Sequence, residues 1–248
     1  GLKIIVDQLP ETTIIATGSS SFDLSGQVGE PLVGRKWTLT LFPLAQIELR
    51  KRFTPFELKK QLSSFLLYGS YPETLTAETD EKKKAVLKEI ATSYLFRDIL
   101  AFEGVRGSDV AHNLTKLLAL QIGSEVSLNE LATNLMVNVR TVARYLDILE
   151  KSFIITSLGP YSRNLRSELR SKKKYYFLDC GIRNAVISQF NDLDLRNDVG
   201  ALWENFLVVE RIKAQTYTET YTNNYFWRTW EQQEIDWVEE RDGKLFGF

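Results

Sequence analysis

Apolar residues recur at helical spacing through the middle of the chain and in short runs towards both ends. The helical spacing predicts helices over residues 55–69, 80–102, 109–122, 127–135, 138–149 and 200–213. The short runs predict strands over residues 13–17, 153–158, 174–178, 225–229, 234–239 and 244–248. Asp242-Gly243 predicts a hairpin turn between the last two strands. The pattern therefore predicts a mixed α/β protein.

Two of the predicted helices form a more specific pattern. Ser127 begins an S-L-N-E capping box, and a turn at Met136–Asn138 leads into the second helix. Two short helices followed by a two-stranded ribbon predict a winged helix. The second helix exposes Asn138, and the candidate DNA-binding residues of helix and wing are Arg140, Thr141, Arg144, Lys172, Lys173 and Lys174.

The charge distribution supports this hypothesis. The chain has 31 Lys and Arg against 32 Asp and Glu, yet Asn138–Lys174 contains nine basic residues and three acidic ones. A local excess of positive charge is typical of a nucleic-acid surface. Winged helices also bind proteins, and the lysine run is equally compatible with a solvated hairpin.

Composition excludes several classes of protein. Of 248 residues, 44% are hydrophobic and 25% are charged, as in soluble globular proteins. One cysteine, Cys180, and one histidine, His112, are too few for an internal disulfide, a zinc site or a Cys/His nucleophile pair. No apolar run is long enough to cross a membrane. We expect a cytoplasmic protein and, since residue 1 is Gly, a piece of a longer product.

Several stretches together resemble one family. They are TGSSS (17–21), Gly34-Arg35, YGSYPE (68–73), YLFRDI (94–99), KYYFLDCGIRNA (174–185), GALWENF (200–206), YFWRT (225–229) and EIDWV (234–238). In this order they resemble the bacterial and archaeal AAA-superfamily ATPases that carry a winged helix and a restriction-endonuclease-like C-terminal domain of unknown function. The resemblance covers nearly the whole chain.

The resemblance implies a nucleotide site near the start of the chain. It makes TGSSS the sensor-1 strand end, with Ser19 or Ser20 facing the γ-phosphate, and Arg35 a phosphate-sensing or neighbour-facing arginine. A helix-capping role for the serines and a structural role for Arg35 are the alternatives. No G-x-x-x-x-G-K-[ST] loop occurs in the sequence. We therefore expect ATP and Mg²⁺ in the parent protein and no ATP hydrolysis by this chain alone.

The resemblance also implies a nuclease-like site near the end of the chain. Glu204 on a helix and Asp236 on a strand match the order of metal-binding carboxylates in restriction-endonuclease-like domains. An E-x-K on the last strand would complete the set, but the chain ends at Phe248 within that strand. Two carboxylates and a lysine suit Mg²⁺-assisted phosphodiester hydrolysis. The alternatives are a structural partner for Glu204 and an ion pair for Asp236, and we expect no intact metal site in this chain.

These expectations combine into a domain plan and two functional hypotheses. The plan is an ATPase-core remnant over 1–53, a helical lid over 54–123, a winged helix over 124–179 and a truncated nuclease-like α/β domain over 180–248. The first hypothesis is part of an AAA-type ATPase that faces DNA and associates with other copies of itself. The second is a non-catalytic regulator that binds DNA or protein through the winged helix. Neither involves a membrane, and whether the chain is itself an enzyme stays open.

Overall fold

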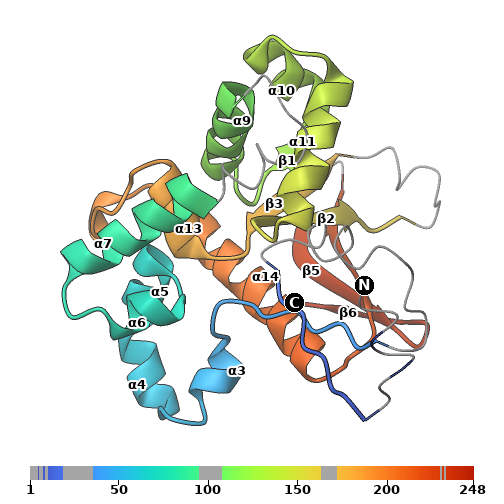
Figure 1. Ribbon diagram of the computed structural model, residues 1–248. Helices are drawn as coiled ribbons and strands as arrows, with labels where there is room; N and C mark the ends of the chain where they lie inside the picture. Colours follow the sequence, from blue (N-terminus) through green and yellow to red (C-terminus); the bar gives the residue numbers. More distant parts are fainter. Residues whose placement is uncertain are drawn as a thin grey trace.

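The structure, a computed structural model, describes residues 5, 8, 11–18, 36–94, 108–162, 172–229, 231 and 233–248. Its helices are α3 (Gln46–Leu49), α4 (Pro55–Lys60), α5 (Leu62–Tyr68), α6 (Pro72–Thr76), α7 (Asp80–Glu89), α9 (Ser108–Leu120), α10 (Leu128–Leu135), α11 (Val139–Lys151), α13 (Cys180–Val186) and α14 (Val199–Tyr217). A π-helical turn, Ile90–Tyr94, follows α7, and a 3₁₀ turn, Leu193–Leu195, precedes α14. Figure 1 shows α9–α11 grouped at one end and α3–α7 at another.

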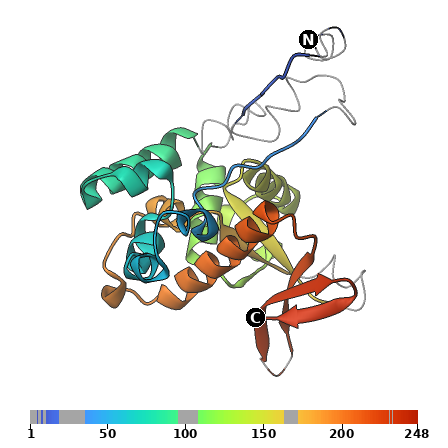
Figure 2. The ribbon, with the colours of Figure 1, turned by 90° about the horizontal axis from the view of Figure 1, so that it is seen from below.

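Six strands of the described residues form one sheet. They are β1 (Glu125–Val126), β2 (Ile155–Pro160), β3 (Lys173–Phe177), β4 (Asn223–Arg228), β5 (Glu234–Arg241) and β6 (Lys244–Gly247), in the order β1-β3-β2-β4-β5-β6. Only the short β2–β4 pairing among them is parallel. Figure 2 shows β4–β6, in red, extending past one end of α14.

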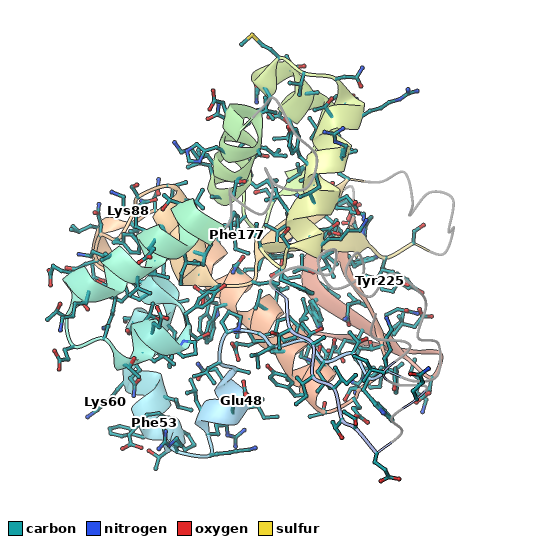
Figure 3. The ribbon with its side chains drawn as sticks, viewed as in Figure 1. Glu48, Phe53, Lys60, Lys88, Phe177 and Tyr225 are labelled. Atoms are coloured by element: carbon teal, nitrogen blue, oxygen red, sulfur yellow. The ribbon has the colours of Figure 1, made fainter. Side chains whose placement is uncertain are left out.

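Strand β3 is covered on both faces because its side chains alternate between two cores. Tyr175 and Phe177 belong to the larger core, beneath α9, α10 and α11. Tyr176 belongs to a smaller core with Val208 and Val209 of α14. Alternate residues of a strand point to opposite faces, so α11 and α14 flank the same sheet from opposite sides. Figure 3 shows Phe177 of β3 near the middle of the molecule and Tyr225, a residue of β4, to its right.

Most predicted elements are confirmed. The helix pair is α10 and α11, with Ser127 and Asn138 as their N-caps. The last three strands form β4–β6, and Asp242 and Gly243 take the positive φ values, 50° and 72°, of a type I′ hairpin turn. The predicted helix 55–69 is divided at Gln61 into α4 and α5, and α5 ends at Gly69 with φ 68°.

Two predictions need correction. The predicted strand 13–17 is not formed, since residues 12–18 are neither helix nor strand and are almost all exposed. A strand needs a neighbouring strand to pair its backbone, and in the described residues this segment has none. The solvated-hairpin interpretation of the lysine run also fails at Lys174, which is 1% exposed, whereas Lys172 and Lys173 are exposed.

The mixed α/β class is confirmed, while the domain boundaries stay predictions. The larger core joins residues from Leu66 to Leu202 and so includes side chains from both sides of the predicted boundaries at 123/124 and 179/180. Among the described residues, no helix combines the length and apolarity needed to cross a membrane.

Candidate functional site

The outer surface of α11 presents the helix residues that the sequence assigns to DNA. Arg140 and Arg144 are exposed and Thr141 is half-buried. Asn138 fixes the start of the helix, since its Oδ1 accepts a hydrogen bond of 2.8 Å from the backbone N–H of Arg140. The opposite face of α11 lies in the larger core. This packing holds both arginines on the outer side of the helix.

The three lysines of the predicted wing have different environments. Lys172 and Lys173 are exposed, and Lys173 Nζ lies 3.5 Å from Ser157 Oγ. Lys174 is only 1% exposed. Its side chain points to the α14 face of the sheet, opposite to that of Lys173. Lys174 is therefore not on the surface that a wing contact with DNA requires.

Lys174 lies instead among three carboxylates. Its Nζ is 2.5 Å from Glu234 Oε1, 3.0 Å from Glu204 Oε1 and 3.3 Å from Asp236 Oδ1. We call these four residues the Lys174 cluster. Glu204 comes from α14, whereas Glu234 and Asp236 lie two residues apart on β5 and so share one face of that strand. The structure thus brings together the two predicted nuclease-like carboxylates, Glu204 and Asp236.

The electrostatics of the cluster follow from burial. Burial raises the pKa of Glu204, although hydrogen bonds from Tyr176 and Lys174 oppose the rise. Burial disfavours the charge of Lys174, but the hydrogen bond to Glu234 and the charge of Glu204 outweigh it, so the pKa of Lys174 is above its usual value. Burial and Glu204 also raise the pKa of Tyr176. At neutral pH the lysine is therefore an ammonium, and the Tyr176 hydroxyl donates to Glu204 Oε1 at 2.7 Å.

The cluster does not fit the divalent ion that the nuclease resemblance implies. Mg²⁺ takes oxygen ligands at about 2.1 Å in near-octahedral geometry. Here the nearest oxygens of all three carboxylates face the Lys174 ammonium. Among the residues that the structure describes, no group of three or more His, Cys, Asp or Glu side chains is arranged to hold a metal ion.

A second polar centre surrounds Asp179, which is buried where β3 leads into α13. Its carboxylate accepts hydrogen bonds from the backbone N–H groups of Ser70, at 2.7 Å, and Ile182, at 3.1 Å. Burial raises the pKa of Asp179. Lys213 of α14 donates to Ser70 Oγ at 3.3 Å and to Glu210 at 2.9 Å. Two of the sequence motifs, YGSYPE and KYYFLDCGIRNA, therefore meet at this centre and contact α14.

The approach at this centre is close enough to require glycine. A Cβ on Gly69 would lie 1.9 Å from Asp179 Oδ1, and a Cβ on Gly181 would lie 2.4 Å from the carbonyl oxygen of Tyr68. A small pocket beside it is lined by Ser70, Asp179, Asn205 and Lys213 together with apolar side chains. Hydrogen bonds from Ser70 to Asp179 and from Lys213 to Ser70 join the end of α5, the start of α13 and α14 at this centre.

Three predicted site residues cannot be placed in this geometry. Ser19, Ser20 and Arg35, the candidate nucleotide-sensing residues, lie outside the described residues. Their roles stay predictions, as do the DNA contacts of Arg140, Thr141, Arg144, Lys172 and Lys173.

Three family models match consecutive parts of the chain. A domain of unknown function, DUF8612, matches residues 59–193, which is more than half of the 248 residues. The chain belongs to the DUF8612 family. An AAA domain model matches residues 1–50, and a second domain of unknown function, DUF4143, matches residues 199–248. The AAA match relates the DUF8612 chain to the AAA-type ATPases.

The DUF8612 chain is similar to uncharacterized proteins of bacteria and archaea. Rv2008c of Mycobacterium tuberculosis is 31% identical over 253 residues, covering 100% of the chain and 54% of the relative. MJ1544 of Methanocaldococcus jannaschii is 24% identical over 241 residues, covering 91% and 52%. A protein of Haemophilus influenzae is 25% identical over 191 residues, covering 72% and 46%. The chain thus spans about half the length of these curated relatives. No solved structure matches it.

The boundary between the DUF8612 and DUF4143 matches passes through the Lys174 cluster. Lys174 and Tyr176 lie in the DUF8612 match, whereas Glu204, Glu234 and Asp236 all lie in the DUF4143 match. Every ion pair of Lys174 within the cluster therefore joins one family region to the other.

Glu234, Tyr176, Asp179 and Lys213 were not predicted as site residues, and Lys174 was predicted to contact DNA instead. Glu234 could have been found, because it stands two positions before Asp236 on the same predicted strand. Tyr176 and Lys174 lie in the run K-Y-Y-F-L, whose continuous apolar character is typical of a strand covered on both faces. Asp179 stands in the KYYFLDCGIRNA stretch, but the contacts of Asp179 and Lys213 with Ser70 could not be predicted, since Ser70 is 109 and 143 residues away from them.

Proposed function

We propose that this chain is the part of an AAA-type ATPase that binds duplex DNA, through a winged helix formed by α9–α11 and β1–β3. The AAA match over residues 1–50 supports the ATPase relation. The whole protein would use ATP and Mg²⁺. No phosphate-binding loop occurs in this sequence, and the candidate sensor residues lie outside the described ones, so we assign no nucleotide contact to this chain.

The order and pairing of the elements support the winged-helix assignment. One helix, a short strand, two helices and two further strands follow in sequence, and the three strands pair antiparallel in the order β1-β3-β2. Met136 joins α10 to α11 in the left-handed conformation, with φ 52° and ψ 42°, which makes the turn tight. A second helix placed in this way is the one that enters the major groove in helix-turn-helix proteins.

The observation on which the proposal rests is the division of α11 into two faces. Val142, Tyr145 and Leu149 are buried, while Arg140 and Arg144 are exposed on the first two turns. Guanidinium groups bind phosphate oxygens and the edge of guanine. Lys172 and Lys173 add exposed positive charge at the start of β3, on the strand that packs beneath this helix.

The proposal is tested by duplex binding at several salt concentrations. Fluorescence anisotropy of a labelled duplex would compare the wild type with the Arg140→Ala/Arg144→Ala variant. Each lost phosphate contact flattens the slope of log affinity against log salt by about 0.9, so we expect the double variant to flatten it by about 2. A Lys59→Ala/Lys88→Ala variant loses the same charge from exposed positions on α4 and α7 and should keep the wild-type slope.

The same titration separates the second hypothesis. Absence of duplex binding by the wild type at low salt would rule out the DNA-binding proposal and favour a regulator that contacts protein. Equal slopes for the two double variants would show that the binding is not at α11.

A further inference from the structure

We propose that, in the Lys174 cluster, the ammonium group of Lys174 takes the place of a divalent cation between Glu204, Glu234 and Asp236. The Lys174 cluster then links the DUF8612 region to the DUF4143 region through ion pairs and is not a metal centre. This inference is independent of the proposed DNA binding.

The hydrogen-bond donors of Lys174 match the carboxylates around it in number. A lysine ammonium has three N–H bonds and no acceptor. Lys174 Nζ has three carboxylate neighbours, at 2.5, 3.0 and 3.3 Å, contributed by two elements. Each N–H bond can thus be assigned a separate carboxylate. Such charge-assisted hydrogen bonds are about twice as strong as neutral ones.

The Lys174 side chain is also enclosed by its neighbours. Its side chain is 2% exposed, and its Nζ lies 5.3 Å from the centroid of the Phe226 ring. A divalent ion at the carboxylates would have to share them with a buried ammonium of the same sign, or displace it. Displacement would bury an uncompensated cation or unpack the lysine stem, and both cost free energy.

The cluster keeps a net negative charge. Three carboxylates carry more negative charge than one ammonium neutralises, and this excess by itself would attract a further cation. Part of this excess faces solvent, since the Asp236 side chain is 54% exposed. Arg228 of β4 also approaches the cluster, with its Nε 3.9 Å from Glu234 Oε2. The excess charge is therefore exposed to solvent at Asp236 and lies near a guanidinium that also pairs with Glu125, at 3.4 Å.

The Lys174 cluster lies at the junction of the two family regions. Lys174 and Tyr176 reach it from β3, while the carboxylates come from α14 and β5. Gly123, three residues after the end of α9, packs closely against Glu204, because a Cβ there would lie 2.8 Å from Glu204 Oε2. Residues of both family regions contact one ammonium. Loss of that ammonium should therefore weaken the packing between the two regions.

The test compares thermal unfolding of the wild type and a Lys174→Met variant of the whole chain, with and without millimolar MnCl₂. We expect MnCl₂ to leave the wild-type Tm unchanged. Lys174→Met retains the apolar stem, but it leaves three carboxylates without their cation and should lower the Tm by about 5–10 °C. MnCl₂ should then raise the Tm of the variant, and adding Asp236→Asn to it should abolish that rise.

Two outcomes would overturn the proposal. One is a Lys174→Met variant with the wild-type Tm. The other is a wild-type Tm that rises with MnCl₂, when the Glu204→Gln and Asp236→Asn variants do not show this rise. If Lys174→Met does not fold, electron paramagnetic resonance measures the free Mn²⁺ signal in the presence of the wild-type protein. An undiminished free-ion signal supports the ammonium ligand, and a loss of signal that Asp236→Asn restores overturns it.

Discussion

Helices α11 and α14 flank the same sheet from opposite faces but are attached to it in different ways. The buried positions of α11 are Val142, Tyr145, Leu146, Ile148 and Leu149, all apolar or aromatic. The buried positions of α14 include Asn205, Lys213 and Gln215 beside Leu202, Val208 and Val209. One helix is held mainly by burial of apolar surface, and the other also by specific hydrogen bonds and ion pairs.

The difference concerns how each helix is positioned. Apolar burial is non-directional, so a helix such as α11 tolerates changes that conserve volume. Asn205, by contrast, accepts from the backbone N–H of Phe177 at 2.8 Å and donates to the carbonyl oxygen of the same residue at 2.9 Å. This pair of bonds selects one position of α14 along β3. The buried polar residues of α14 thus specify its position, whereas the apolar residues of α11 supply non-directional burial.

The largest effect is expected from a cavity beneath α11. Leu146 is 3% exposed in the larger core, so Leu146→Ala removes buried methyl groups and should reduce the free energy of unfolding by about 3–4 kcal/mol. Urea denaturation followed by circular dichroism measures the change.

The matched control for this prediction is Leu146→Met, which conserves volume and should cost less than about 1.5 kcal/mol. Equal losses for the two variants would show that burial of apolar volume is not what attaches α11.

A smaller effect is expected from the polar face. Asn205→Ala removes both hydrogen bonds to Phe177 in a buried environment, and we expect a loss of about 2–3 kcal/mol in the same assay. Asn134→Ala, at an exposed position of α10, should change stability by less than about 0.5 kcal/mol. A loss for Asn205→Ala no larger than that of Asn134→Ala would remove the distinction between the two helices.

The two helices also show how far the sequence can predict the fold. The spacing of apolar residues predicted α11 nearly to its ends, because its buried face is apolar throughout. In α14 it predicted Leu202, Phe206, Val209 and Ile212 as one face, and the buried polar residues were invisible to it. Apolar periodicity detects only buried positions that are apolar. A polar side chain is buried only when another group forms hydrogen bonds with it, and in α14 those groups are distant in sequence.

The candidate site has the same limit. Glu204 and Asp236 were implied by the family resemblance, which placed their lysine on a later strand. The run Lys172–Lys174 was interpreted as one basic surface, although alternation along β3 separates Lys173 from Lys174. The predicted strand 13–17 failed for a related reason, since apolar residues in sequence do not provide a neighbouring strand.

The smallest effect concerns the start of α14 and depends on pH. Asp198, the N-cap residue, lies 2.5 Å from Arg183 Nη1 and 2.7 Å from Arg196 Nη2, and both arginines are buried. Burial by itself would raise the pKa of Asp198, but the hydrogen bonds and charges of Arg196 and Arg183 outweigh it and lower the pKa to about 2, from the usual 3.8. The folded state therefore binds the proton less tightly than the unfolded state.

The sign of the pH effect follows from linkage. The stabilisation by Asp198 is fully present above the unfolded pKa and is lost as pH falls from 3.8 towards about 2. We expect this carboxylate to contribute about 1–2 kcal/mol to the loss of stability over that interval. Urea denaturation at several pH values would show a shallower acid dependence for Asp198→Asn than for the wild type. Asp194→Asn, at an exposed position four residues earlier, should keep the wild-type dependence. Parallel curves for Asp198→Asn and the wild type would mean that apolar contacts, as in α11, rather than this ion pair, hold the start of α14.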